Sequence, residues 1–354
     1  MKDHLLRYAS LVLLAVLLLA PGCATQRSPS KPILQRYEFE RPQMGLPFRL
    51  ILYAESPSKA TDAAEAVWSR ISDLNAILSD YESESELSRL SRTSGSGTWV
   101  PLGSDLARVL TTANGISRDS NGAFDVTVGP EVTLWKRARR QRELPAQTAI
   151  DAARRSSGWT LVELRERDGR LEAMLVESGM RLDLGAIAKG YALEEAAFVL
   201  RQQGIRSFLL AGSGDMVLGD SPPGQTGWTV EAGVFDSTKA PTRRVLSLAN
   251  TALATSGDSF QRAEIGGVRY SHIIDPRTGI GLMDHGLVTV IAPSAMLADA
   301  LSTTVSVMGP KSGLPLATRH GAEVWFLRKP NAEVENVQSA GFPRGQHPSP
   351  SPLP

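Results

Sequence analysis

Residues 48–327 contain both strand-like and helix-like segments, and the two kinds do not alternate strictly along the chain. The spacing of apolar residues predicts helices at residues 58–78, 104–118, 186–203, 295–308 and 311–319. β-prone runs predict strands at residues 48–53, 170–176, 181–184, 207–211, 228–234, 244–254, 287–291 and 322–327. A regular parallel sheet requires helices that alternate with strands. This order therefore predicts an α+β fold or a layered α/β fold.

The N-terminal segment has the composition of a targeting signal. Lys2 and Arg7 precede an apolar run at residues 11–20, and Cys23, the only cysteine, follows a small residue. A basic start followed by a short apolar run is typical of a secretory signal, and a cysteine directly after it is typical of a bacterial lipoprotein. We expect a signal peptide at residues 1–22, and a lipidated Cys23 with its tether at residues 23–36. A plain signal peptide and an uncleaved anchor remain alternatives.

The C-terminal segment and the charge balance limit the remaining possibilities. Residues 329–354 end in alternating proline and serine, which predicts a disordered tail and leaves residues 37–328 as one globular unit. The chain has 38 Lys and Arg against 37 Asp and Glu, so it has no general attraction for nucleic acid. A single cysteine also excludes a disulfide framework and a thiolate metal cluster.

The stretch Asp183-Leu184-Gly185-Ala186-Ile187-Ala188-Lys189-Gly190-Tyr191 combines a carboxylate, a glycine turn and a lysine at the start of a predicted helix. Free N–H groups at a helix N-terminus, together with a lysine, suit a phosphate or pyrophosphate. The spacing is not that of a P-loop. A tight strand–helix turn capped by Asp183 gives the same pattern, so both interpretations remain open.

Asp299 and Thr303 are four residues apart on a predicted helix, so their oxygens share one face. A carboxylate and a hydroxyl, completed by a backbone carbonyl, form an all-oxygen set that suits Mg²⁺. The alternative is a capping aspartate beside a hydroxyl that bonds back to its own helix.

His272 lies between strand-like residues and precedes an Asp-Pro-Arg-Thr-Gly turn at residues 275–279. It belongs to a dense polar cluster with the Thr-Ser-Gly-Asp segment at residues 255–258, which makes it a candidate functional histidine. A purely structural hydrogen bond is the alternative.

Residues 122–130 place a short β-prone run between glycines. Phe124 beside Asp125 could hold a planar ring and a ribose or amide. A buried phenylalanine next to a turn-forming aspartate is the alternative.

These stretches, in this order, closely resemble the ApbE family of FAD:protein FMN transferases. Met44-Gly45, Ser79-Asp80-Tyr81, Leu134-Trp135 and the Gly-Asp at residues 214–215 also match. The resemblance implies a single ApbE-like, T-fold-related catalytic unit with mixed sheets and packed helices. It also implies an Mg²⁺-dependent enzyme that cleaves FAD, attaches FMN to a threonine or serine of a target flavoprotein, and releases AMP.

The resemblance also assigns roles to individual residues. The FAD site would be lined by Met44, Tyr81, Ala123, Phe124, Asp125, Asp183, Lys189 and Ile274. The Mg²⁺ ligands would be the backbone carbonyl of Ala186, Asp299 and Thr303, with Ser302 beside them. His272 would lie near the reacting centre as the catalytic residue. The acceptor hydroxyl needs a base, for which His272, Asp258 and Asp275 are candidates.

The chain departs from the usual family pattern at Leu46, Ser91 and Ser213, where threonine, asparagine and glycine are common. Because Asp183, Lys189, Asp299 and Thr303 are present, we expect an active enzyme. An FAD pyrophosphatase that yields FMN and AMP, and a non-catalytic FAD-binding lipoprotein, are the alternatives. With Cys23, the resemblance implies lipid anchoring on the periplasmic side of a bacterial membrane, in the first place the inner one.

Overall fold

The structure is a computed structural model that describes residues 33–233, 243–257, 262–329 and 334–345. The predicted signal peptide, Cys23 and the candidate base Asp258 lie outside these residues. Among the helices in the described ranges, none combines the length and the apolar character needed to cross a membrane.

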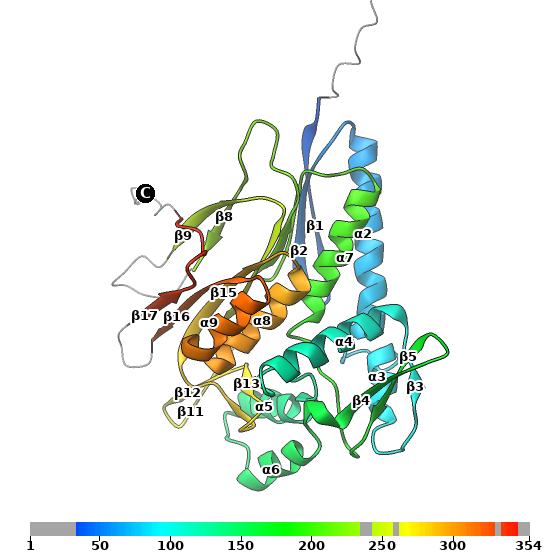
Figure 1. Cartoon of the computed structure of the whole chain (residues 1–354), viewed down its shortest axis with the longest axis vertical. Coiled ribbons are helices and arrows are strands. Elements are labelled where there is room, and N and C mark those ends of the chain that lie inside the picture. Colours follow the sequence, from blue (N-terminus) through cyan, green and yellow to red (C-terminus); the bar gives the residue numbers. More distant parts are fainter. Residues whose placement is uncertain (1–32, 234–242, 258–261, 330–333, 346–354) are drawn as a thin grey trace, which may run out of the picture. The chain divides into compact units, whose positions relative to one another are not determined.

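An antiparallel sheet of eight strands forms the centre of the fold (Figure 1). In spatial order the strands are β1 (Gln35–Gln43), β2 (Leu46–Ala54), β6 (Phe208–Gly212), β7 (Asp215–Leu218), β10 (Thr251–Gly257), β15 (His285–Ala292), β16 (Glu323–Lys329) and β17 (Glu335–Gln338). Every neighbouring pair in this sheet is antiparallel. Together with the helices described below, this arrangement confirms the predicted α+β class.

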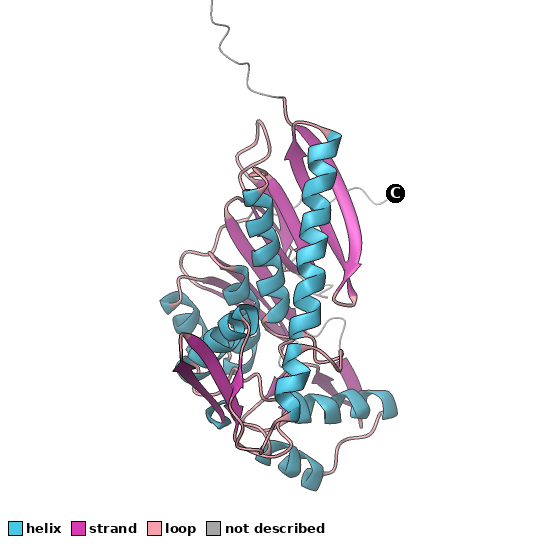
Figure 2. Ribbon diagram, turned by 90° about the vertical axis from the view of Figure 1, so that its right-hand side faces the viewer, coloured by secondary structure: helices cyan, strands magenta, loops and turns pink. Residues whose placement is uncertain are grey.

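Helices cover one face of this sheet, and a β-hairpin covers the other (Figures 1 and 2). The helices are α2 (Pro57–Leu78), α7 (Ala188–Gln202), α8 (Ala295–Met308) and α9 (Pro310–Arg319), and the hairpin consists of β8 (Trp228–Ala232) and β9 (Arg244–Leu248). Leu50 and Leu52 of β2 pack into the helical core, whereas Ile51 packs on the hairpin side. This alternation follows from the two-residue period of a strand.

Helix α2 forms where the apolar spacing predicts it. Ser56 caps its N-terminus by accepting a hydrogen bond from the Lys59 N–H, and Pro57 occupies the first turn. The residues at helical spacing on one face, Ala63, Val67, Ile71, Leu74 and Leu78, are all buried. The sequence-based prediction of this helix is therefore confirmed.

The residues between α2 and α7 form a second group of elements, which lies beside the helical face of the sheet. It contains α3 (Glu86–Arg92), α4 (Ser104–Asp119), α5 (Gly129–Gln141), α6 (Gln147–Arg155), the 3₁₀ helix η1 (Trp159–Leu161), and a small sheet of β3 (Val100–Pro101), β5 (Arg170–Leu175) and β4 (Val162–Arg167). Two short hairpins pack against α5, namely β11 (Arg262–Ile265) with β12 (Val268–Ser271), and β13 (Ile274–Asp275) with β14 (Ile280–Gly281). The Trp135 indole joins them, since it donates to the Gly279 carbonyl at 2.8 Å.

Two of the predicted strands, and the β-prone run that begins at residue 122, differ in the structure. Residues 181–184 are not a strand: Leu182 and Leu184 are buried, but the backbone N–H groups of Leu182 and Asp183 bond to Ser91 Oγ and the Val126 carbonyl. Residues 122–128 form turns, and α5 begins at Gly129. The run at residues 244–254 is two strands in different sheets, because Asn250 turns the chain with a positive φ of 52°.

The predicted disordered tail begins too early. β17 pairs with β16, and the Phe342 side chain is 2% exposed against Trp325, with ring centroids 5.9 Å apart. A strand of four residues is too short to leave a recognisable pattern in the sequence. Among the described residues, folded structure is therefore present beyond residue 328, at Lys329 and in the range 334–345.

Candidate active site

A cavity of about 1080 Å³ brings together most of the residues singled out in the sequence. Its volume is slightly above the usual range for small-molecule pockets, about 300–1,000 Å³, which suits a ligand as large as a dinucleotide. Twelve of the thirteen predicted FAD, metal and catalytic residues line its wall: Met44, Tyr81, Ala123, Phe124, Asp125, Asp183, Ala186, Lys189, His272, Ile274, Asp299 and Thr303. The thirteenth, Ser302, does not.

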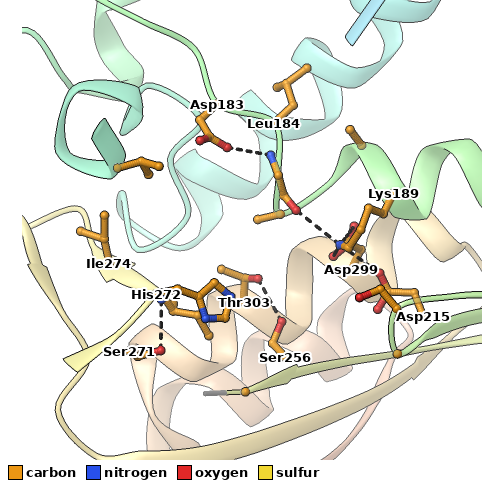
Figure 3. A pocket seen from close by; sticks show the side chains of 18 of the residues that line it. Asp183, Leu184, Lys189, Asp215, Ser256, Ser271, His272, Ile274, Asp299 and Thr303 are labelled. Carbon is orange, nitrogen blue, oxygen red and sulfur yellow. Dashed lines mark hydrogen bonds and ion pairs between the residues drawn. The ribbon is translucent and has the colours of Figure 1, made fainter. Parts of the chain in front are cut away.

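Lys189 lies between two buried carboxylates at one end of this cavity (Figure 3). Its Nζ is 3.1 Å from both carboxylate oxygens of Asp299 and 3.0 Å from Asp215 Oδ2. Burial by itself would lower the pKa of Lys189, but the two carboxylates outweigh burial and raise that pKa above its ordinary value. Lys189 therefore stays positively charged.

Asp215 is 3% exposed, and its Oδ2 accepts no hydrogen bond from the described residues. Lys189 is close enough to form an ion pair with this oxygen but is not aligned to donate to it. Burial, and next the charge of Asp299, raise the pKa of Asp215 to about 7. Two carboxylates thus share one ammonium group here, which leaves an excess of negative charge when both are ionised.

The first turn of α7 is attached to α8 through Asp299. The backbone N–H of Gly190 donates to Asp299 Oδ2 at 3.0 Å, and the Lys189 ammonium donates to the same carboxylate. A carboxylate is stabilised at a helix N-terminus, where N–H groups are unpaired. The sequence predicted free N–H groups for a phosphate at this helix start, and the Gly190 N–H is instead bonded to Asp299.

Hydroxyl groups of β10 and α8 lie together on the same side of the cavity. Ser256 Oγ lies 3.1 Å from Thr303 Oγ1 and 2.7 Å from Ser302 Oγ. Ser302 is fully buried and does not line the cavity. It donates to the backbone carbonyl of Asp299 at 2.8 Å and so helps to fix the position of that residue. The donors available on the wall are thus a carboxylate, hydroxyls and backbone carbonyls.

This donor set fits a hard divalent cation such as Mg²⁺. Seven carboxylates and only four lysine or arginine side chains line the cavity, so an anionic pyrophosphate would enter a site that is already negative. Among the described residues there is no cluster of three or more His, Cys, Asp or Glu side chains placed to hold a metal. A metal here would therefore need the hydroxyl and carbonyl oxygens as well as Asp299.

Asp183 forms the turn that was one of the two interpretations of its segment, and it also lies at the cavity wall. Its Oδ1 accepts a hydrogen bond from the Gly185 N–H at 2.9 Å, as expected for an aspartate that forms a turn, and its side chain also lines the cavity (Figure 3). Burial, and next the charge of Asp80, raise the pKa of Asp183. The turn thereby holds at the cavity wall a carboxylate whose ionised form is disfavoured by burial and by a neighbouring negative charge.

Phe124 and Asp125 show the buried phenylalanine and the turn-forming aspartate that were one interpretation of their segment. Phe124 is 2% exposed, and Asp125 accepts hydrogen bonds from the Thr127 N–H at 2.8 Å and the Thr127 hydroxyl at 2.7 Å. Burial raises the pKa of Asp125. Both residues line the cavity, so this turn contributes to its wall.

The three candidate bases have different positions. His272 lines the cavity and is exposed to solvent, on the segment between β12 and β13 (Figure 3). Asp275 does not line the cavity and forms a two-point ion pair with Arg277, with both N–O distances 2.8 Å. Asp258 lies outside the described residues. Among the described candidates, His272 is therefore the one on the cavity wall.

Sequence reasoning assigned no role to several charged wall residues, among them Asp215 and Lys136. Asp215 belongs to the Gly-Asp segment that carried the family resemblance, and that segment was the only available signal. Lys136 follows the matching Leu-Trp segment and lies on α5, which the sequence did not predict as a helix. Ser91, where the family often has asparagine, accepts a hydrogen bond from the Leu182 N–H at 3.2 Å.

Comparison with known proteins supports the resemblance to the ApbE family. The ApbE family profile matches residues 44–326. The FAD:protein FMN transferase of Escherichia coli K12 is 27% identical over 344 residues, covering 95% of this chain and 96% of that protein. The enzyme of the same name from Haemophilus influenzae is 30% identical over 289 residues, covering 80% of this chain and 82% of the relative.

The fold also matches a solved structure of this family. The apo flavinyl transferase ApbE of Pseudomonas stutzeri superimposes with a TM-score of 0.76 at 27% identity, covering 88% of this chain and 98% of that structure. The matched region includes the segments that build the cavity from Met44 to Thr303. This chain belongs to the ApbE family.

Proposed function

We propose that this chain is an FAD:protein FMN transferase that uses Mg²⁺ to move FMN from FAD to a threonine or serine hydroxyl of a target flavoprotein, with release of AMP. The observation that carries the proposal is the meeting of Lys189, Asp215 and Asp299 in a cavity large enough for a dinucleotide. The names of the relatives at 27–30% identity support the same reaction.

The two parts of FAD, its ring systems and its pyrophosphate, are assigned to different ends of the cavity. Apolar groups such as Phe124 and Ile274 would receive the ring systems of FAD, and the Lys189 end would receive the pyrophosphate. Asp299, Thr303 and the Ala186 carbonyl would hold Mg²⁺. The chemistry supplied by the bound ion is neutralisation of negative charge on the phosphate oxygens during transfer.

The chain's own groups have three tasks in this reaction. The Lys189 ammonium remains charged and can stabilise the growing negative charge on phosphate oxygens. The acceptor hydroxyl must lose a proton, and His272 is the wall residue proposed to receive it. The cavity must hold the pyrophosphate in line with the incoming hydroxyl, because positioning is a large part of phosphoryl-transfer catalysis.

The test is incubation of residues from Ala24 onward with FAD, Mg²⁺ and candidate acceptor domains, followed by mass spectrometry of the acceptor. The expected result is an added FMN mass on one threonine or serine and an equal amount of AMP. His272→Gln is expected to lower the transfer rate while FAD binding stays the same. Absence of FMN on every plausible acceptor would count against the transferase.

Two other outcomes correspond to different functions. FMN and AMP released without an acceptor would identify an FAD pyrophosphatase with water as the nucleophile. Tight FAD binding without AMP release in the presence of Mg²⁺ would identify a flavin-binding lipoprotein, an idea that the departures at Leu46 and Ser213 suggest.

We also propose that Cys23 is lipidated and anchors the enzyme on the periplasmic side of a bacterial membrane, in the first place the inner membrane. The support is the residue pattern of the N-terminal segment. Globomycin, which blocks cleavage of lipoprotein signals, should cause a longer precursor to accumulate. Cys23→Ala should abolish incorporation of labelled fatty acid and should leave the longer precursor uncleaved.

A further inference from the structure

Helix α5 brings the charged side chains of Lys136 and Arg139 to the cavity wall, at a place that the proposed function does not use. Val132, Trp135, Lys136 and Arg139 of this helix line the cavity, whereas Arg137 and Arg140 do not. The Lys136 side chain is 31% exposed, whereas Arg140, one turn further along the helix, is in the exposed class. Lys136 is therefore held at the wall and is not simply part of a solvated face.

The Lys136 ammonium contacts three groups from two distant chain segments. Its Nζ lies 3.5 Å from Asp80 Oδ2, 3.9 Å from Asp183 Oδ2, and 4.4 Å from the centroid of the Tyr81 ring. Asp80 and Tyr81 follow the end of α2, and Asp183 precedes α7. The Lys136 side chain thus contacts two segments, distant in the chain, that the resemblance places in the FAD site.

Tyr81 depends on this contact for its orientation. Its backbone is fixed by a turn, in which Ser79 Oγ accepts from the N–H groups of Tyr81 and Glu82 at 3.2 and 3.3 Å. The side chain, however, is 77% exposed, so few packing contacts restrict the ring. The ammonium group over one ring face supplies a cation–π attraction and leaves the ring at the cavity wall.

Asp183 depends on Lys136 for charge compensation. The side chains of Asp80 and Asp183 are only 14% and 15% exposed, and their like charges repel. Arg181 pairs with Asp80, with Nη2 3.6 Å from Oδ2, but Lys136 is the ion-pair partner that reaches both carboxylates among the described residues. Removal of the ammonium group would therefore change the position and the charge of Asp183.

We propose that Lys136 is a positioning residue for FAD, which holds the Tyr81 ring and the Asp183 carboxylate in the arrangement that receives the ring systems of the substrate. The inference rests on the proposed function, because it takes FAD as the bound molecule. An aromatic ring stacks well only in a fixed orientation, and a carboxylate accepts hydrogen bonds from ring or ribose donors. Since Lys136 acts through these two groups, its loss should weaken FAD binding and leave the chemical step largely unchanged.

The experiment measures FAD binding to the full-length chain by flavin fluorescence, without Mg²⁺ and without an acceptor. Lys136→Met keeps the length of the side chain and removes the charge, and it should raise the Kd for FAD about tenfold and reduce the fluorescence quenching at saturation. Lys136→Arg should restore most of the affinity. Arg140→Met, on the same helix but off the cavity wall, is the matched control and should change the Kd less than about twofold.

A double-mutant cycle with Tyr81→Ala tests whether Lys136 acts through its neighbours. Lys136→Met should raise the Kd by a clearly smaller factor in the Tyr81→Ala background than in the wild type, since part of its role is then already lost. An unchanged Kd for Lys136→Met, or an equal factor in both backgrounds, would overturn the proposal. Thermal unfolding of each variant separates a binding defect from a folding defect.

The turnover data distinguish this inference from the proposed function. In Lys136→Met the KM for FAD should rise with the Kd, while kcat for AMP release stays within about threefold of the wild type. A wild-type chain that binds FAD but releases no AMP would refute the proposed function. The effect of Lys136 on FAD binding would be measured independently of that result.

Discussion

Gly190 in the first turn of α7 lies against the backbone of Ala295 in α8, so closely that a Cβ atom on Gly190 would be 2.2 Å from the Ala295 carbonyl oxygen. The same Cβ would lie 2.7 Å from Cβ of Asp299. Only glycine permits this approach, because backbone atoms cannot move aside as a flexible side chain can. The close crossing of the two helices is what brings Lys189 to Asp299.

Gly190→Ala should destabilise the fold by roughly 1–3 kcal/mol or more, since the added methyl group forces α7 and α8 apart. Urea unfolding followed by circular dichroism measures the change. Gly115→Ala in α4 is the matched control: nothing lies within 4 Å of its Cβ position, and alanine is the better helix former by about 0.5–1 kcal/mol. Equal effects at the two positions would contradict the close-contact explanation.

Asp299→Ala should lower Mg²⁺-dependent AMP release by roughly 100-fold or more, because a hard oxygen ligand and the partner of Lys189 are both lost. Asp299→Asn keeps an oxygen that can accept from the Gly190 N–H, so it should fold like the wild type and still be inactive. AMP release is measured against Mg²⁺ concentration, with Asp168→Ala, an exposed aspartate, as the control. Turnover like that of the wild type at low Mg²⁺ would refute the ligand assignment.

In chelator, the free energy of unfolding should fall as the pH rises from about 4 to about 7. The pKa of Asp215 is about 7 in the folded chain and near its ordinary 3.8 when unfolded, so the folded state binds more protons in this interval and loses stability as they leave. Deprotonation of Asp215 should lower the free energy of unfolding by roughly 2–4 kcal/mol over this pH interval. Asp215→Asn should remove this part of the slope, and an identical slope in that variant would exclude Asp215 as its source.

Phe342→Ala should destabilise the fold by about 3–5 kcal/mol, because this side chain is buried against Trp325 on the hairpin side of the central sheet. Phe198→Ala on α7 removes the same atoms from a side chain that is 55% exposed, and should cost less than about 1 kcal/mol. Thermal unfolding compares the two variants. Equal stability would mean that the segment after β17 does not belong to the folded unit.

Some of the fold could be predicted because burial leaves a periodic pattern along the chain. Helices α2 and α8 were predicted to within a residue, since their buried residues recur at the period of a helix. The same reasoning failed at residues 181–184, where Leu182 and Leu184 alternate with polar residues as in a strand. Alternation shows which side chains are buried, but it does not show where the backbone hydrogen bonds go.

The candidate site shows the same division. Twelve of the thirteen residues predicted for it line one cavity. They could be assigned because the resemblance to the ApbE family rests on motifs in short local segments of the sequence. Lys136 and Asp215 were missed, since each gains its meaning only from neighbours that are distant in the chain.

The sequence by itself determined the kinds of elements, the N-terminal targeting pattern, and the oxygen-rich and lysine-bearing segments that mark the family. The tertiary structure decided which of these groups meet. Lys189 and Asp299 are 110 residues apart in the chain and 3.1 Å apart in the fold, and the close crossing at Gly190 sets that distance. Burial and neighbouring charges then fix the protonation of Asp215 and Lys189, and these are properties of the surroundings in space that no local pattern of residues contains.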